Sequence, residues 1–417
     1  MMAVDDVLVL AHRIPYPPDK GDKIRTYHVI RHLAQRYRVH LGCFVDDPND
    51  WRHAEALRDL CADTYFAPVG TGRVALAAVT ALHRNMALSI AAYGHSGMAA
   101  WVQGIVNRRQ PVGIYAVSSA MAQFVKGING IRCPTVIDFV DVDSDKWRLR
   151  AAQAHWPLSW IFRREATRVL DHDRAASRRF DHCLFVSRSE ADKFCSAAPD
   201  AAAKVECLPN GIDGAYFSPH GVYPDPYAGA PTLVFTGTMG YWPNQDAVSW
   251  FVTDVLPVLR QDMPSLGFAV VGRAPGRAVR RLARREGVRI VGSVPDVRPY
   301  LAHALAVVAP LRHSPGVANK ILEGMAMAKP VIATNEALAG LPMRPGEDLL
   351  VANSAADFCR TLAPYYANPT ATTELGERAR ARVLRDFSWP VLLAGLDGLI
   401  NERTKNHASN GDVLMVR

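Results

Sequence analysis

The sequence predicts an α/β fold with two domains, each a parallel sheet with helices on both faces. Short apolar runs of strand character, for example at 7–11 and 135–139, alternate with helical patterns along the whole chain, and this alternation is typical of parallel sheets. A chain of 417 residues is too long for one compact core, so two domains are expected. A linker rich in glycine, proline and tyrosine at 219–231 precedes a new strand pattern at 234. From these features we expect the following division: domains at 1–208 and 209–388, a helix at 389–403 that crosses back to the first domain, and a mobile tail at 404–417.

Composition and charge narrow the class of protein. Hydrophobic residues make up 49% of the chain, which is enough for a large core. The net charge is +8, and residues 1–205 hold 27 basic and 21 acidic side chains against 21 and 19 in the rest. The basic first half indicates an anionic partner, such as phosphates or an acidic membrane surface. Nucleic acid is disfavoured, because the chain lacks zinc-ligand spacing, an RNP-like aromatic motif and a lysine-rich tail.

Cysteine usage and apolar runs predict a cytoplasmic location. The seven cysteines are scattered, odd in number and never spaced as C-x-x-C, so we expect them to be reduced. Acidic residues precede the first short apolar run, which we therefore interpret as a strand and not a signal peptide. The longest weakly polar region, at 74–105, is interrupted by charged and polar residues and should not span a bilayer.

A basic loop follows the first predicted strand. Gly21, Lys23 and Arg25 lie where a helix begins near Asp22, at the carboxyl end of the strand, where open α/β sheets bind ligands. Gly21 would let a backbone approach closely. Cations are unfavourable at a helix N-terminus, so their placement indicates an anionic ligand. A solvated basic helix start is the alternative.

Four aspartates, at 138, 141, 143 and 145, follow the strand predicted at 135–139. A metal-and-nucleotide D-x-D motif belongs to a single-domain fold, which this chain does not resemble. A calcium loop would need a glycine at its sixth position and a distal glutamate, and both are missing. We favour a third interpretation, in which Asp138 or Asp141 points toward a ligand and the others cap a helix and contact solvent. No metal site is predicted.

Residues 147–168 combine three tryptophans with five arginines. An interfacial helix of this composition can lie on an acidic membrane. A core-facing helix pair around Pro157 explains the same residues, and we favour it.

The stretch 309–334 is the strongest candidate for a binding site. We expect a loop, a helix that starts at Ser314-Pro315 and a buried strand, with anion-binding N–H groups at the helix start. Lys320 and Glu323 should share one face of this helix. With Arg312 they suit a nucleoside diphosphate, since cations would hold the phosphates and the carboxylate would accept from two ribose hydroxyls. A surface Lys–Glu pair on an ordinary helix is the alternative.

Glycines follow three predicted strands of the second domain, namely Gly237, Gly272 and Gly292. A backbone without a side chain could approach a phosphate at these strand ends.

These motifs resemble glycosyltransferase family 4, the retaining group-1 transferases of the GT-B fold. The resemblance covers nearly the whole chain and includes PPDKGDKIR at 17–25, DFVDVDSDKW at 138–147, LPNGID at 208–213, GTMGYWPNQDAV at 237–248 and GVANKILEGMAMAKPV at 316–331. PDKGDKIR, VDVDSDKW and NKILE together resemble sugar transferases associated with exopolysaccharide loci of the PEP-CTERM/exosortase type. The resemblance implies two Rossmann-like doubly wound domains that face each other across a cleft.

The resemblance also implies roles for single residues in the second domain. Glu323 matches the ribose-binding carboxylate, and Gly316, Asn319 and Gly237 belong to the matching nucleotide-sugar site. The family usually has a second glutamate eight positions earlier, where this chain has Pro315.

Two further departures concern charge and catalysis. The family's Arg and Lys after the first strand of the second domain are missing, so the diphosphate would need other cations. The candidate cations in the second domain are Lys320, Arg312 and Arg273, and those in the first domain are Lys23 and Arg25. We also expect Lys320 to act in catalysis. The family's catalytic histidine falls near 138–141, where the chain has two aspartates. We assign its place under the anomeric carbon to Asp141, with Asp138 as the second candidate.

The function that the resemblance implies is a retaining, metal-independent hexosyltransferase. The nucleoside-diphosphate sugar would be a substrate, no cofactor would be needed, and a glycan or polyprenyl-linked acceptor would bind the first domain. We expect a cytoplasmic protein, with contact to the acidic inner face of the membrane and no nucleic acid partner. Two alternatives are a sugar-nucleotide 2-epimerase of the same architecture and a non-catalytic scaffold that binds nucleotide sugars.

Overall fold

The computed structural model divides the chain into two compact units. It describes residues 4–69, 81, 83, 85–128, 130–313 and 318–401. The first unit comprises Met1–Leu208 together with Leu393–Arg417, and the second comprises Pro209–Leu392. Of the predicted features, the tail at 404–417, Ser314-Pro315 and Gly316 lie outside the described residues.

The first unit is built on a seven-stranded parallel sheet in the order β3-β2-β1-β4-β5-β6-β7. Its strands are β1 (Asp6–Ala11), β2 (Arg38–Val45), β3 (Asp63–Pro68), β4 (Gly113–Val117), β5 (Thr135–Val140), β6 (His182–Phe185) and β7 (Val205–Cys207). Its helices are α1 (Gly21–Leu33), α2 (Ala54–Arg58), α4 (Leu88–Ala91), α5 (Ser96–Arg109), α6 (Ala122–Lys126), α7 (Asp143–Gln153), α8 (Leu158–Arg179), α9 (Arg188–Ala197) and α18 (Leu396–Ile400).

The second unit repeats this architecture with a six-stranded parallel sheet in the order β10-β9-β8-β11-β12-β13. Its strands are β8 (Thr232–Thr236), β9 (Gly267–Val271), β10 (Val288–Gly292), β11 (Ala306–Ala309), β12 (Val331–Ala333) and β13 (Leu350–Val351). Its helices are α10 (Trp242–Trp250), α11 (Leu256–Asp262), α12 (Arg277–Leu282), α13 (Arg298–Ala302), α14 (Asn319–Ala326), α15 (Ala355–Ala367) and α16 (Pro369–Phe387), and α17 (Trp389–Leu393) ends at the unit boundary.

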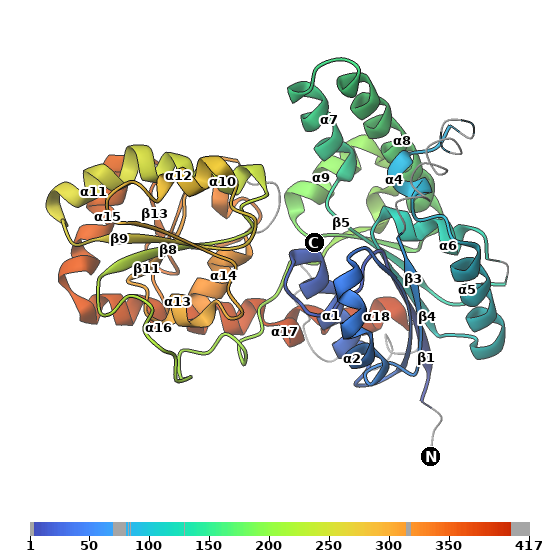
Figure 1. Ribbon diagram of the computed structural model, residues 1–417. Helices are drawn as coiled ribbons and strands as arrows, with labels where there is room; N and C mark the ends of the chain where they lie inside the picture. Colours follow the sequence, from blue (N-terminus) through green and yellow to red (C-terminus); the bar gives the residue numbers. More distant parts are fainter. Residues whose placement is uncertain are drawn as a thin grey trace. The chain divides into compact units, whose positions relative to one another are not determined.

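The predicted α/β fold with two parallel sheets is confirmed, and helices cover both faces of each sheet (Figure 1). Strands β4, β8 and β11 are buried along their whole length, which explains why they read as unbroken apolar runs. In each sheet the strand order reverses beside the first strand, between β1 and β4 and between β8 and β11. Open α/β sheets bind ligands at the carboxyl ends of strands at such a switch point.

Close packing places α14 beside this point in the second unit. A Cβ on Gly324 would lie 2.8 Å from Val307 Cγ2 of β11, and one on Gly376 of α16 would lie 1.9 Å from the Ala328 carbonyl oxygen. Gly324 therefore lets the helix lie close to its neighbours.

Two helix predictions need correction. Residue Ala318 has an extended backbone, and α14 begins after it at Asn319, so the start predicted at Ser314-Pro315 is wrong. The C-terminal helix is also interrupted: α17 and α18 are separate helices, and Gly395 caps the second. Asp397 of α18 accepts a hydrogen bond from Arg36, in the turn between α1 and β2, which ties this segment to the first unit.

None of the helices described in the structure combines the length and apolar character needed to cross a membrane.

Candidate active site

In the second unit, the loops after β8 and β9 pack backbone against backbone. Gly237 and Gly272 have φ angles of 151° and 153°, which side chains with a Cβ rarely adopt. A Cβ on Gly272 would lie 1.8 Å from the Gly237 carbonyl oxygen. The structure shows that these glycines let two loops touch at the carboxyl edge of the sheet. Their role as points of approach for a phosphate stays a prediction.

Helix α14 presents Lys320 and Glu323 to the carboxyl end of β8. Lys320 Nζ donates to Asn244 Oδ1 at 3.1 Å and lies 4.7 Å from the centre of the Phe235 ring. The hydroxyl of Thr236, the last residue of β8, donates to Glu323 Oε2 at 3.4 Å. The predicted common face of Lys320 and Glu323 therefore lies against the switch-point strand, and the alternative of a solvated surface pair is wrong, because Lys320 is buried and Glu323 half-buried.

This pair is electrostatically incomplete. Burial lowers the pKa of Lys320 to about 8, and Glu323 offsets this only in part. Burial also raises the pKa of Glu323, although Lys320 and the Thr236 hydroxyl act against the shift. Lys320 and Glu323 do not form an ion pair with each other in the part of the chain that the structure describes. A buried cation with an amide and a ring as partners can stabilise an added anion strongly.

Sequence reasoning gave no role to Asn244, which fixes Lys320. Its side-chain nitrogen donates to the Thr238 carbonyl at 3.0 Å, so its oxygen is directed to Lys320. Pro243, at the start of α10, is a helix-start signal in YWPNQ that could have placed Asn244 in the first turn after β8.

Arg312 does not join this group. Its guanidinium donates to both carboxylate oxygens of Asp246 on α10, with Nε at 3.0 Å from Oδ2, and the pair raises the pKa of Arg312. The expectation that Arg312 supplies a free charge for a diphosphate is not met, because Asp246 already neutralises it. Asp246 lies 66 positions earlier in the chain, beyond the reach of a local pattern.

The other predicted residues of this site lie nearby or outside the described chain. Asn319, the first residue of α14, accepts from Asn210 Nδ2 at 3.2 Å. Arg273 is half-buried, and its carbonyl accepts from the Met239 N–H at 2.8 Å. Gly316 lies outside the described residues.

In the first unit, Arg25 and Asp138 are fully buried and bind each other. Arg25 Nε donates to Asp138 Oδ2 at 2.6 Å and Nη2 to Oδ1 at 3.1 Å, while Nη1 donates to the Leu208 carbonyl at 2.6 Å. The Tyr115 hydroxyl also donates to Asp138, at 2.5 Å. Burial alone would lower the pKa of Arg25, but Asp138 and Tyr115 raise it above its usual value. The predictions that Arg25 reaches a phosphate and that Asp138 is catalytic are therefore corrected, since neither is exposed.

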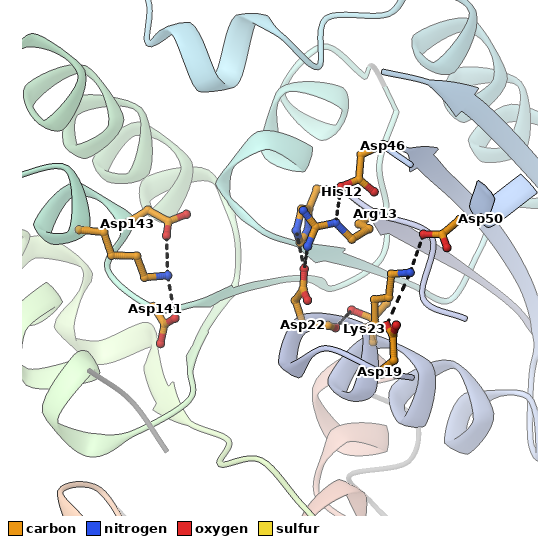
Figure 2. A network of polar contacts seen from close by, with 11 residues as sticks. His12, Arg13, Asp19, Asp22, Lys23, Asp46, Asp50, Asp141 and Asp143 are labelled. Atoms are coloured by element: carbon orange, nitrogen blue, oxygen red, sulfur yellow. Dashed lines mark hydrogen bonds and ion pairs between the residues drawn. The ribbon is translucent and has the colours of Figure 1, made fainter. Parts of the chain in front are cut away.

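Asp141 occupies the accessible position after β5. Val140 has a φ of 68°, an outlier for a β-branched residue, and the register of β5 shifts between Asp138 and Val140. Strained backbone of this kind costs free energy and often marks a functional site. Lys146 Nζ lies 2.8 Å from the Asp141 carboxylate (Figure 2). Burial raises the pKa of Asp141, and Lys146 opposes the rise.

A second polar network, which sequence reasoning missed, lies after β1 (Figure 2). Arg13 donates to Asp22 at 2.6 Å and to Asp46 at 2.8 Å, and His12 lies 3.3 Å from the same Asp22 oxygen. Burial alone would raise the pKa of Asp22, but His12 and Arg13 lower it well below its usual value. His12 and Arg13 directly follow the first strand, and this position could have marked them in the sequence as candidate site residues.

The basic loop of the first unit is likewise neutralised. Lys23 is buried and donates to Asp50 at 2.6 Å, so it does not offer the free charge that we expected. Gly21 is the exposed first residue of α1.

Comparisons with known proteins identify the class of this fold and domain. Residues 230–368, which include β8, α10 and α14, match the family described as "Glycosyl transferases group 1". A search of curated protein sequences finds no match. The solved structures with similar folds include Alr3699/HepE from Anabaena in complex with UDP and glucose, at 14% identity and a TM-score of 0.65, covering 97% of this chain and 99% of that one.

Two further structures extend the similarity. Sucrose-phosphate synthase from Thermosynechococcus elongatus is 18% identical with a TM-score of 0.68, covering 97% of this chain and 100% of that one. WaaG, a glycosyltransferase involved in lipopolysaccharide biosynthesis, is 14% identical with a TM-score of 0.63, covering 94% of this chain and 98% of that one. The second unit therefore carries a group 1 glycosyltransferase domain within a chain of the GT-B fold, and the protein is a glycosyltransferase.

Proposed function

We propose that this protein is a retaining, metal-independent member of glycosyltransferase family 4. It transfers a sugar from a nucleoside-diphosphate sugar to a lipid-linked glycan acceptor, without a cofactor, at the cytoplasmic face of the membrane. The resemblance to transferases of PEP-CTERM/exosortase-type loci supports a role in exopolysaccharide biosynthesis. HepE has been solved in complex with UDP-glucose, which supports a nucleotide-sugar donor for this chain too.

The observation that carries the proposal is the unneutralised pair on α14. Lys320 is a buried cation held by Asn244 beside the half-buried carboxylate of Glu323, at the carboxyl end of the first strand of the second sheet. A diphosphate would complete the environment of Lys320, and two ribose hydroxyls would donate to Glu323. A nucleoside diphosphate offers both groups together, the phosphates for Lys320 and the ribose hydroxyls for Glu323.

In this mechanism, Lys320 acts on the slow step, which is departure of the nucleoside diphosphate. Negative charge builds on the leaving oxygen, and a fixed cation in a water-poor site stabilises it without reorganisation. Asp141 of the first unit serves as the polar group under the anomeric carbon, where its carboxylate stabilises the positive charge that develops there. Asn244 is a positioning residue, because it acts through Lys320.

Donor binding is tested by the thermal shift that nucleoside diphosphates cause. A ligand at 100 times its dissociation constant adds about 2.7 kcal/mol to the free energy of unfolding, so UDP and GDP can be compared directly. Glu323→Gln should lose most of the shift, because a neutral amide is a weaker acceptor for two hydroxyls. Arg312→Gln is the matched control and should keep it. Equal shifts for wild-type protein and Glu323→Gln would contradict the assignment.

Transfer itself is tested with a lipid-linked acceptor and each candidate donor, in buffer containing EDTA. The proposal expects undiminished transfer in EDTA and a product whose anomeric configuration, read by NMR, equals that of the donor. Donor alone should remain almost unchanged. Rapid conversion of the donor without acceptor would favour a 2-epimerase, and tight nucleotide binding without any turnover would favour a scaffold.

A further inference from the structure

The α7–α8 hairpin carries an exposed apolar surface that the fold of the first unit does not use. Helices α7 and α8 run side by side (Figure 1), and Trp147 contacts Phe162 across them with ring centres 5.6 Å apart. In α8 the buried residues begin only at Glu165. The segment 147–164 is here called the hairpin tip. Trp147 packs against a core cluster and Ala151 is buried, so the core-facing helix pair that the sequence favoured is confirmed in part, while the other residues of the segment are half-buried or exposed.

Large apolar side chains are concentrated on the hairpin tip. Trp156 is 82% exposed, Leu149 60%, Trp160 57% and Leu158 53%. Tryptophan and leucine are costly to expose in such density on a monomer, and contiguous exposed apolar surface marks an interaction site.

Charge identifies the partner of this surface. The hairpin tip contains Arg148, Arg150, Arg163 and Arg164 and no acidic residue between Asp145 and Glu165. Arg148 pairs with Asp145 at its edge, and the Arg150 guanidinium lies 5.0 Å from the centre of the Trp147 ring. Apolar side chains that include tryptophan, flanked by arginine, suit the boundary of an anionic bilayer, where the rings enter the headgroup region and the cations meet lipid phosphates.

We propose that the hairpin tip docks on the surface of an acidic phospholipid bilayer. This inference deepens the proposed function, because a lipid-linked acceptor is presented at a bilayer. A second copy of this chain is a poorer occupant, since a two-fold contact would place the same arginines against each other.

Vesicle co-sedimentation tests the proposal with vesicles of phosphatidylcholine alone and vesicles that also contain phosphatidylglycerol. The full-length protein should bind the acidic vesicles selectively, and 0.5 M salt should weaken binding because it screens the arginines. The variant Trp156→Ala/Trp160→Ala should bind acidic vesicles about tenfold more weakly or worse, since two apolar rings leave the interface. Arg148→Gln/Arg150→Gln/Arg163→Gln should lose roughly fivefold for each arginine.

Trp51→Ala is the matched control, because Trp51 is a tryptophan elsewhere on the first unit that is 41% exposed. This variant should bind acidic vesicles like the wild-type protein. Equal binding by Trp156→Ala/Trp160→Ala and wild type would overturn the proposal. So would equal binding to neutral and acidic vesicles, or a dimer detected by light scattering that the tryptophan variant abolishes while vesicle binding is absent. The assay contains no donor or acceptor, so a failure of the proposed transferase function would leave its result unchanged.

Discussion

Arg25 in the first unit and Lys320 in the second are both buried cations near a carboxylate, and they are in opposite electrostatic states. Arg25 binds both oxygens of Asp138 and the Leu208 carbonyl, and its pKa is raised because Asp138 outweighs the effect of burial. Lys320 has an amide oxygen and the Phe235 ring as partners, and burial lowers its pKa to about 8. A completed buried ion pair belongs to the fold, whereas an incomplete one costs stability and is available to a ligand.

The largest expected effect is on catalysis, from Lys320→Met. Transfer should fall on the order of a hundredfold or more, comparable with the loss of a charge-stabilising donor in other enzymes. The free energy of unfolding should at the same time rise by about 1–3 kcal/mol at pH 7, because a buried cation with a lowered pKa is removed. Transfer kinetics and urea unfolding measure the two effects. An inactive but destabilised variant would mean that Lys320 is structural.

The converse change, Arg25→Leu, should destabilise the first unit by about 3–5 kcal/mol, because Asp138 is left buried without its cation. Urea unfolding monitored by circular dichroism gives the value. Arg25→Leu/Asp138→Leu should cost less than the sum of the two single variants, as residues in one ion pair are coupled. Additive costs would show that the two side chains act independently and would remove the contrast with Lys320.

The pH dependence of donor use should report the loss of the proton from Lys320. Lys320 has a pKa of about 8 in the free protein, so kcat/KM for the donor should fall as pH rises through about 8, when the ammonium loses its proton. The stability effect has the opposite sign: the folded pKa lies below the ordinary value of 10.5, so the cost of burying the charge is present below pH 8 and is relieved between pH 8 and 10.5. A kcat/KM profile that stays flat to pH 10 would contradict the role of Lys320.

The smallest effect is expected for Arg312→Gln. The Arg312–Asp246 pair is partly exposed, and exposed pairs contribute little, so the free energy of unfolding should change by less than about 1 kcal/mol. Transfer should stay within about twofold of wild type, since the pair leaves Arg312 no free charge for a phosphate. Loss of transfer in this variant would return Arg312 to the donor site and weaken the distinction between complete and incomplete pairs.

The alternation of strands and helices could be predicted because it depends on local sequence. Parallel strands that are covered on both faces are largely apolar, and β1, β8 and β11 show this in the sequence. The candidate donor stretch around Lys320 and Glu323 could also be located, since the two lie three positions apart on one helix. The helix start at Asn319 could not, because the extended backbone at Ala318 follows no signal in the sequence.

By itself the sequence determined the fold class, the number of parallel sheets and the helix that carries the candidate donor site, all through periodicities of a few residues. Only the tertiary structure decided which charges are neutralised. The partners lie far apart in the chain: Arg25 and Asp138 are separated by 113 positions, Arg312 and Asp246 by 66, and Lys320 and Asn244 by 76. The order of strands in the sheet brings such residues together, so the free energy of a buried charge depends on contacts that a local pattern does not contain.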